Sequence, residues 1–213
     1  MNSQSHDTVK RHLIDPAPRF RDRRNPLPAV FLDRDGVINE EVHYLSRVED
    51  FHLIKGVATA IRRLNEAGIP VIVVTNQSAV ARGYITEDQL MDIHKAMVAL
   101  LAREQASVQG VFYSPYHEKG EGEYRRQSTC RKPEPGMLLA AAEEFAISLP
   151  KSVLVGDRVN DVRAGHAAGT RAIMVRTGHG AKETTFAEAS EADLITDDLA
   201  AAVDEILASM ITR

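Results

Sequence analysis

The sequence contains very little cysteine and no long apolar run. Cys130 is the single cysteine among 213 residues, so no disulfide can form within the chain. No stretch is apolar over the length that a bilayer requires, and the N-terminus does not resemble a signal peptide. We therefore expect a cytoplasmic location. The hydrophobic content of 44% and the charged content of 26% suit one globular domain.

An excess of positive charge is also absent. The formal net charge is -4, whereas proteins that bind nucleic acids or anionic membranes broadly present a basic face. The composition therefore argues against nucleic-acid and membrane partners, and it leaves the oligomeric state open. A phosphorylated ligand would have to be held locally, by a few side chains.

Two parts of the chain differ in composition. Residues 1–27 are polar, contain several prolines and carry a basic run from Arg19 to Arg24. We predict an N-terminal arm here, and a solvated extension without a specific ligand is the simplest interpretation. Residues 28–213 show the regular apolar patterns of a folded domain.

The domain alternates between strand-like and helix-like segments. Five apolar runs have the composition of strands buried on both faces: Ala29–Leu32, Val71–Val74, Val111–Tyr113, Val153–Val155 and Ala172–Val175. Segments of helical character separate or follow them: Val57–Ala67, Glu87–Arg103, Met137–Phe145, Asp161–Ala168 and Leu199–Ala208. This alternation predicts an α/β fold with a parallel sheet, right-handed crossovers and helices on both faces.

Three of the predicted strands end in polar residues. Asp33 and Asp35 follow the first, Thr75-Asn76-Gln77-Ser78 ends the second, and Asp157 follows the fourth. Ligands of such sheets bind beyond the carboxyl ends of the strands, so these residues should converge. Carboxylates this close repel each other unless a cation lies nearby. Because carboxylate oxygens and water are the ligands that Mg²⁺ prefers, the sequence predicts a Mg²⁺ site.

The same residues suit phosphoryl transfer. One carboxylate can attack phosphorus while a second protonates the leaving oxygen and then activates water. Thr75 and Asn76 supply hydrogen-bond donors for the phosphoryl oxygens, and Lys132 with Arg131 supplies positive charge. An isolated Asp-x-Asp is usually a turn or a surface pair, and an isolated lysine is usually solvated. It is the whole set, in this order and at strand ends, that indicates a site.

These motifs resemble those of the haloacid dehalogenase superfamily of phosphatases, over roughly residues 29–202. The resemblance implies a Rossmann-like sheet in a phosphatase domain at 28–213, a Mg²⁺ requirement and an aspartyl-phosphate intermediate. It implies that Asp33 is the nucleophile and Asp35 the general acid and base, and that Thr75 and Lys132 contact the phosphoryl group. The implied metal ligands are Asp33, Asp35 and Asp157, with Asp161 supporting Lys132 or the water shell of the metal.

Longer strings resemble one subgroup of that superfamily, which acts on heptose bisphosphates or histidinol phosphate. They include VTNQSAVARGYIT and VGDRVNDVRAGHAAG. The sugar-binding segments of the subgroup match Glu41, Val42, His43, Tyr44, Thr75, Asn76, Gln77 and Ser78. Arg131 matches a contact to a substrate phosphate, and its planar guanidinium suits a second phosphate. Arg82 either caps a turn or contacts a substrate phosphate.

The resemblance implies hydrolysis of the 7-phosphate of a heptose 1,7-bisphosphate, so the expected partner is a phosphorylated sugar. Histidinol phosphate or another small phosphomonoester is the alternative substrate. A non-catalytic module that binds sugar phosphates is an alternative of another class. About 20 residues separate Asp35 from the helix that begins near Gly56, which leaves no room for a large cap domain.

One departure from the subgroup concerns zinc. Its members commonly carry a loop in which a Cys-x-His pair and a Cys-x-Cys pair bind zinc, but the four positions here are Ser114, Tyr116, Ser128 and Cys130. Tetrahedral zinc needs four good donors, so we expect no zinc. The loop from Glu118 to Gln127 is then expected either to be ordered by hydrogen bonds and salt bridges or to be mobile.

Overall fold

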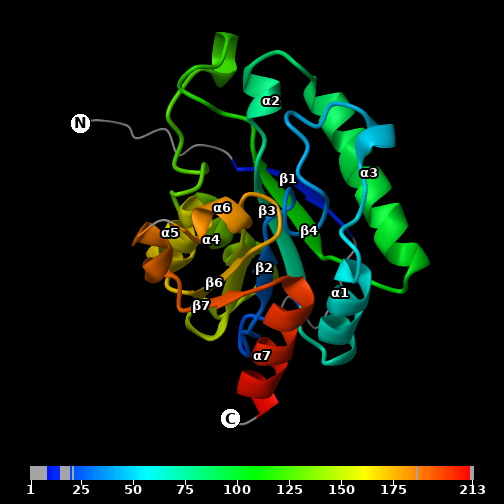
Figure 1. The fold of residues 1–213 in the computed structure, drawn as a ribbon, viewed down its shortest axis with the longest axis vertical. Helices are drawn as coiled ribbons and strands as arrows, with labels where there is room; N and C mark the ends of the chain where they lie inside the picture. Colours follow the sequence, from blue (N-terminus) through cyan, green and yellow to red (C-terminus); the bar gives the residue numbers. More distant parts are fainter. Residues whose placement is uncertain (1–8, 15–19, 21, 186, 212–213) are drawn as a thin grey trace.

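The computed structural model describes residues 9–14, 20, 22–185 and 187–211 (Figure 1). Much of the predicted arm, at residues 1–8, 15–19 and 21, lies outside these described residues. Within the described part of the chain, no helix is long and apolar enough to cross a membrane.

A seven-stranded sheet forms the centre of the molecule, in the order β1-β4-β3-β2-β5-β6-β7. The strands are β1 (Lys10–Leu13), β2 (Val30–Leu32), β3 (Val71–Asn76), β4 (Gly110–Ser114), β5 (Val153–Gly156), β6 (Arg171–Val175) and β7 (Leu194–Thr196). All neighbours from β2 to β7 pair in parallel, and β1 pairs antiparallel with β4. From β2, the sheet continues through β3 and β4 to β1 on one side and through β5 and β6 to β7 on the other. This places a topological switch point, where ligands of such sheets bind, at the carboxyl end of β2.

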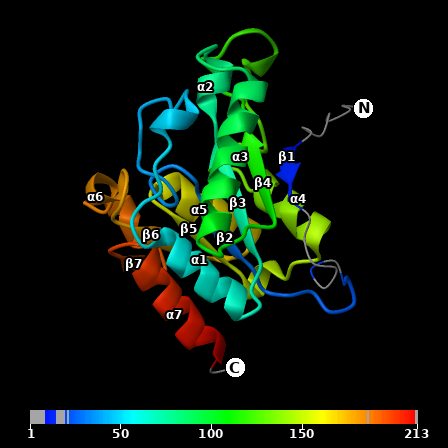
Figure 2. The same cartoon turned by 90° about the vertical axis from the view of Figure 1, so that its right-hand side faces the viewer.

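Helices cover both faces of the sheet (Figures 1 and 2). They are α1 (Val57–Glu66), α2 (Ser78–Ala81), α3 (Glu87–Arg103), α4 (Gly136–Phe145), α5 (Val159–Ala168), α6 (Gly180–Glu183) and α7 (Leu199–Ile211). Short 3-10 helices lie at Val48–Asp50, Gly122–Tyr124, Leu149–Lys151 and Ala187–Glu191. Helices α1, α3 and α7 share one hydrophobic core with the sheet, and α4 and α5 contribute to another on the opposite face.

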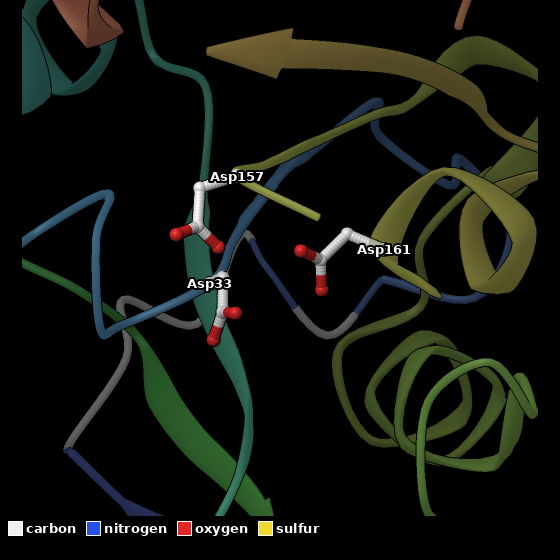
Figure 3. A group of neighbouring side chains, drawn as sticks. All are labelled: Asp33, Asp157 and Asp161. Carbon is white, nitrogen blue, oxygen red and sulfur yellow. The ribbon is translucent and has the colours of Figure 1, made fainter. Parts of the chain in front are cut away.

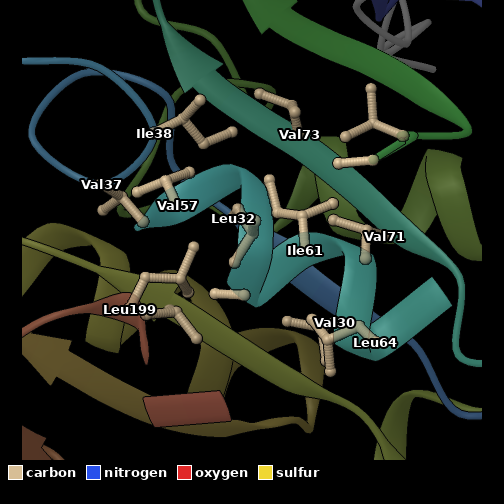
Figure 4. Close-up of a cluster of buried hydrophobic side chains, with 14 of the residues drawn as sticks. Val30, Leu32, Val37, Ile38, Val57, Ile61, Leu64, Val71, Val73 and Leu199 are labelled. Carbon is tan, nitrogen blue, oxygen red and sulfur yellow. The ribbon is translucent and has the colours of Figure 1, made fainter. Parts of the chain in front are cut away.

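Alternate side chains of a strand enter these two cores. Val30 and Leu32 of β2 pack with Ile61 of α1 and Leu199 of α7 (Figure 4), whereas Phe31 belongs to the core on the other face. Successive strand residues point to opposite faces of a sheet, so a strand covered on both sides must be apolar throughout. The continuous apolar runs of the sequence have this cause, and the predicted α/β fold is confirmed.

The N-terminal region differs from the prediction. Lys10–Leu13, inside the predicted arm, form β1 instead of a solvated extension. The strand was missed because its residues are mostly polar and its pairing partner, β4, lies about a hundred residues further along the chain. The domain boundary at residue 27 stays a prediction.

No described segment forms a large cap over the sheet. The connection from β2 to α1 contains the 3-10 helix Val48–Asp50, and the connection from β3 to α3 contains the four-residue α2. Any cover over the carboxyl ends of the strands therefore comes from short loops.

Candidate active site

A pocket of about 400 Å³ opens at the carboxyl ends of β2, β3 and β5. The predicted site residues that line it are Asp33, Asp35, Glu41, Val42, His43, Tyr44, Thr75, Asn76, Gln77, Ser78, Arg131, Lys132 and Asp161. Asp157 lies beside them in a cluster of carboxylates. The residues thus converge as the sequence predicts, while the roles assigned to them stay predictions.

Three carboxylates from two strand ends and one helix share a buried space (Figure 3). Asp33 follows β2, Asp157 follows β5, and Asp161 lies in the first turn of α5. One oxygen of each lies within 4.8 Å of the other two. All three residues are buried.

Lys132 is the cation that faces this cluster. Its Nζ lies 3.0 Å from Oδ2 of Asp33 and 2.5 Å from Oδ1 of Asp161, and it donates to the carbonyl of Val74 at 2.8 Å. Burial alone would lower the pKa of Lys132, but the charges of Asp161 and Asp33 raise it. The lysine is therefore held in its charged form.

Asn76 fixes the backbone of Lys132. Its Oδ1 accepts from the Lys132 N–H and its Nδ2 donates to the Lys132 carbonyl, each at 3.0 Å. A reciprocal amide pair of this kind joins the end of β3 to the segment that carries the lysine. The sequence predicts Asn76 as a substrate contact, and the structure shows it bonded to protein.

One ammonium group does not balance three buried carboxylates. Burial, together with the charges of Asp161 and Asp33, raises the pKa of Asp157 to about 9. Burial also raises the pKa of Asp33 to about 6, against the opposing charge of Lys132. In addition, Oδ1 of Asp157 is buried and has no hydrogen-bond partner among the described residues. A divalent cation would supply the missing charge and would ligate this oxygen, so the residues fit Mg²⁺.

Two glycines allow the chain to close around Asp157. Gly36 (φ 79°) and Gly178 (φ 57°) have left-handed backbones, and a Cβ on either would collide with Oδ2 of Asp157. The same oxygen accepts from the N–H of His179 at 2.7 Å. The loops that follow β2 and β6 thereby enclose the carboxylate from both sides.

Asp35 points into a different network. Arg34 donates to both of its oxygens at 2.8 Å, Asn39 donates at 3.0 Å and Gln77 at 2.8 Å. Burial would raise the pKa of Asp35, but the charge of Arg34 and these hydrogen bonds lower it overall. The structure therefore groups Asp161, rather than the carboxylate of Asp35, with Asp33 and Asp157. The metal-ligand set of Asp33, Asp35 and Asp157 stays a prediction.

Comparison with known proteins agrees with this geometry. The family described as haloacid dehalogenase-like hydrolase matches residues 30–114, and the related family described as HAD-hydrolase-like matches residues 129–202. D-glycero-D-manno-heptose-1,7-bisphosphate 7-phosphatase of Thermosynechococcus vestitus is 43% identical over 195 residues, which cover 88% of this chain and 100% of that protein. The chain belongs to the haloacid dehalogenase-like hydrolases.

Further relatives in this family point to the same subgroup. D-glycero-beta-D-manno-heptose-1,7-bisphosphate 7-phosphatase of Escherichia coli is 41% identical over 82% of this chain and 91% of that protein. The crystal structure of D,D-heptose 1,7-bisphosphate phosphatase from B. bronchiseptica, complexed with magnesium and phosphate, superposes with a TM-score of 0.78. It is 30% identical and covers 86% of this chain and 99% of that chain. The predicted membership in this phosphatase subgroup is confirmed.

The pocket of this haloacid dehalogenase-like hydrolase also carries a group of arginines. Arg82, Arg131 and Arg158 all line it. Burial, and then the charges of Arg82 and Arg158, lower the pKa of Arg131. Nε of Arg82 is buried without a hydrogen-bond partner among the described residues. Cations that crowd in this way suit an anionic group of the ligand.

The sequence motifs did not predict Arg158, Asn160 and His179, which are among the residues of the pocket wall. Arg158 and Asn160 lie between Asp157 and Asp161 in the string GDRVND, so an extension of that motif to its non-acidic members would have found them. His179 lies beyond β6, where no motif was recognised, and its Nε2 lies 3.2 Å from Oε1 of Glu41 across the pocket. Only the closure of the loop after β6 onto Asp157 brings it there.

The rings of the predicted sugar-binding segment make edge-to-face contacts. The rings of His43 and Tyr44 lie 4.2 Å apart, those of Tyr44 and Tyr84 lie 4.6 Å apart, and the guanidinium of Arg82 lies 5.6 Å from the Tyr44 ring centre. Tyr44 has a left-handed backbone (φ 54°), which is rare for a residue other than glycine. Local strain of this kind is often stored at functional sites.

The four positions that match zinc ligands in the subgroup are all buried. Tyr116 packs under the guanidinium of Arg126, at 4.0 Å, and Oγ of Ser128 accepts from the N–H of Cys130 at 3.1 Å. Among the described residues, the carboxylates of Asp33, Asp157 and Asp161 form the single group of three or more potential metal ligands.

Proposed function

We propose that this protein is a Mg²⁺-dependent phosphatase that removes the 7-phosphate of D-glycero-D-manno-heptose 1,7-bisphosphate. The observation that carries the proposal is that one pocket holds both a carboxylate cluster facing Lys132 and a group of arginines around Arg131. A bisphosphate has one phosphate for each of these two groups. The named functions of relatives that are about 40% identical over most of the chain support the same substrate.

Asp33 acts as the nucleophile in this proposal. Its Oδ1 accepts the N–H of Arg34 at 2.7 Å and its Oδ2 lies against Lys132, so the carboxylate is fixed at the floor of the pocket. Attack on phosphorus forms an aspartyl-phosphate as the bond from phosphorus to the sugar oxygen breaks. The hydroxyl of Thr75 and the ammonium of Lys132 stabilise the charge on the phosphoryl oxygens. Bound Mg²⁺, held by Asp33, Asp35 and Asp157, would neutralise further negative charge in the same space.

Asp35 carries the proton in both half-reactions. The structure holds it as a carboxylate through Arg34, Asn39 and Gln77, which suits the second step, in which it takes a proton from the attacking water. In the first step it protonates the sugar alkoxide. A phosphate dianion beside it raises its pKa, so arrival of the substrate favours the protonated form that this step needs.

Asp161 and Asn76 position the lysine. Asp161 holds Nζ of Lys132 and also accepts from the N–H of Arg158 at 3.0 Å, which links the lysine to the start of α5. Asn76 fixes the lysine's backbone. A cytoplasmic location, suggested by the sequence, belongs to this proposal as well.

Phosphate release tests the proposal directly. Both anomers of heptose 1,7-bisphosphate, histidinol phosphate and a panel of sugar monophosphates are supplied with and without Mg²⁺, and Asp33→Asn serves as the blank. We expect Mg²⁺-dependent turnover with a preference for the bisphosphate, and we expect Asp33→Asn to abolish it.

Other outcomes would assign a different function. A preference for histidinol phosphate or another monoester would keep the chemistry and overturn the substrate. Absence of turnover with every compound, together with binding of the bisphosphate, would favour a non-catalytic sugar-phosphate-binding module.

A further inference from the structure

Glu87, the first residue of α3, is the centre of a cluster of polar side chains that includes Tyr124 of the loop at 115–131. Its Oε2 accepts from the hydroxyl of Tyr113 at 2.7 Å, its Oε1 accepts from the hydroxyl of Tyr124 at 2.8 Å, and Nζ of Lys10 lies 3.1 Å from Oε1. We refer to Glu87, Tyr113, Tyr124 and Lys10 as the Glu87 cluster. It joins α3, β4 and the loop at 115–131, which follows β4 directly, to the distant strand β1.

The loop at 115–131 continues from this cluster to the pocket. The carbonyl of Tyr124 accepts from the N–H groups of His117 and Arg126, each at 3.1 Å. The guanidinium of Arg126 covers the ring of Tyr116, and the carbonyl of Tyr116 accepts from Nη1 of Arg131 at 3.2 Å. A series of contacts therefore runs from Glu87 to the guanidinium of Arg131, which lines the pocket.

The pKa shifts of Glu87 and Tyr124 favour a stable hydrogen bond between them. Partial burial would raise the pKa of its carboxyl, but the hydrogen bonds from Tyr113, Tyr124 and Lys10 lower it overall. Burial, followed by the hydrogen bond to Glu87, raises the pKa of Tyr124 to about 12, so the phenol stays a donor. Hydrogen bonds to a charged acceptor are the stronger kind.

We propose that Glu87 is a positioning residue that acts through Tyr124 to hold the loop at 115–131 without a zinc ion. The held loop orients the guanidinium of Arg131 toward the second phosphate of the substrate. The inference rests on the proposed function, because it assigns the aim of Arg131 to the bisphosphate. It also explains how the loop is ordered although three of its four matching positions carry no good zinc ligand: Ser114, Tyr116 and Ser128.

Two variants remove the contact with little change in shape. Tyr124→Phe deletes one hydroxyl, and Glu87→Gln removes the charge and one acceptor oxygen. The matched control is Glu123→Gln, an exposed glutamate in the same loop. Deuterium exchange of residues 115–131 is measured for each protein, and steady-state kinetics are measured with heptose 1,7-bisphosphate and with p-nitrophenyl phosphate in Mg²⁺.

We expect both variants to raise exchange in the loop about tenfold, because a lost hydrogen bond to a charged group changes the opening equilibrium by that order. KM for the bisphosphate should rise about five- to twentyfold while its kcat changes less than twofold. Kinetics with p-nitrophenyl phosphate, which has no second phosphate, should stay at the wild-type values. The control Glu123→Gln should match the wild type in every measurement. A zinc chelator added before Mg²⁺ should leave the exchange of the wild type unchanged.

Several results would overturn the inference. They are wild-type exchange in both variants, an equal loss of activity on both substrates, and a rise in loop exchange when the wild type is treated with the chelator. If the wild type itself shows no preference for the bisphosphate, the proposed substrate fails, and the exchange data still decide whether Glu87 holds the loop.

Discussion

At the scale of single residues, Asp33 is the proposed nucleophile, and burial is unfavourable for its charged carboxylate. Its carboxylate lies in a space shared with Asp157 and Asp161, and burial raises its pKa to about 6. We expect Asp33→Asn to reduce phosphate release by about a thousandfold or more, since the attacking oxygen is lost. Without metal at pH 7, the same variant should melt at a higher temperature, because an amide carries no charge into the cluster.

Phosphate release and thermal melting in a chelating buffer check this prediction. Asp50→Asn, at an exposed position far from the cluster in sequence, serves as the control and should match the wild type in both assays. A lower melting temperature for Asp33→Asn would show that the pairing with Lys132 outweighs repulsion within the cluster.

Asp157 gives a second prediction, which concerns metal binding. A ligand that binds only the folded state at a hundred times its Kd stabilises by about 2.7 kcal/mol, and this corresponds to a rise in Tm of about 5 to 10 °C for a chain of this size. We expect the wild type to show such a rise with saturating Mg²⁺ and Asp157→Asn to show little of it. An equal rise in both proteins would mean that the ion binds elsewhere.

The sequence predicted the site well wherever a polar residue follows an apolar strand. Asp33, Thr75 and Asp157 belong to this class, because parallel strands bring their carboxyl ends to one edge of the sheet. It did not predict the directions of the side chains. Asn76 turns to the backbone of Lys132 and Asp35 turns to Arg34, and these choices depend on contacts across the fold.

At the scale of elements, local sequence signals define helix α3, whereas the short edge strands depend on tertiary pairing. Its bounds were predicted from the sequence, and Thr86 and Gln89 form a capping box at its start. The edge strands β1 and β7 were missed. They have four and three residues, and strands this short are stabilised by pairing with neighbours that a local pattern does not reveal.

His94 makes α3 sensitive to acid. Its ring is fully buried at 5.5 Å from the ring of Tyr113, and neither nitrogen has a hydrogen-bond partner among the described residues. Burial, followed by the charges of Arg34 and His12, lowers its pKa well below 6.5. The unfolded chain therefore binds a proton near its ordinary pKa while the folded chain does not, and stability falls as the pH falls below that value.

We expect this one group to remove about 1 kcal/mol of unfolding free energy between pH 7.5 and pH 5.5. Denaturant unfolding at both pH values measures it. His94→Leu should lack this part of the pH dependence, whereas His52→Gln, at an exposed position, should keep the wild-type dependence. Equal pH dependence in His94→Leu and the wild type would show that His94 is protonated in the fold.

At the scale of the whole molecule, β1 connects the N-terminal region to both the sheet and the Glu87 cluster. It adds a strand to β4, Lys10 pairs with Glu87 at 3.1 Å, and Arg11 pairs with Glu144 of α4 at 3.7 Å. Removal of residues 1–14 should lower Tm by several degrees and raise deuterium exchange in β4 and in the loop at 115–131. Unchanged exchange in β4 would mean that β1 contributes no protection.

The strand β1 also has a consequence for solubility. It is short and carries Lys10, Arg11 and His12, and short charged strands at the border of a sheet resist pairing with a second molecule. Its neighbour in the sheet, β4, has the sequence Gly-Val-Phe-Tyr-Ser and is buried throughout. Without β1, the backbone N–H and C=O groups along that edge of β4 would have no partner strand. The shortened protein should therefore aggregate at concentrations where the intact protein stays in solution.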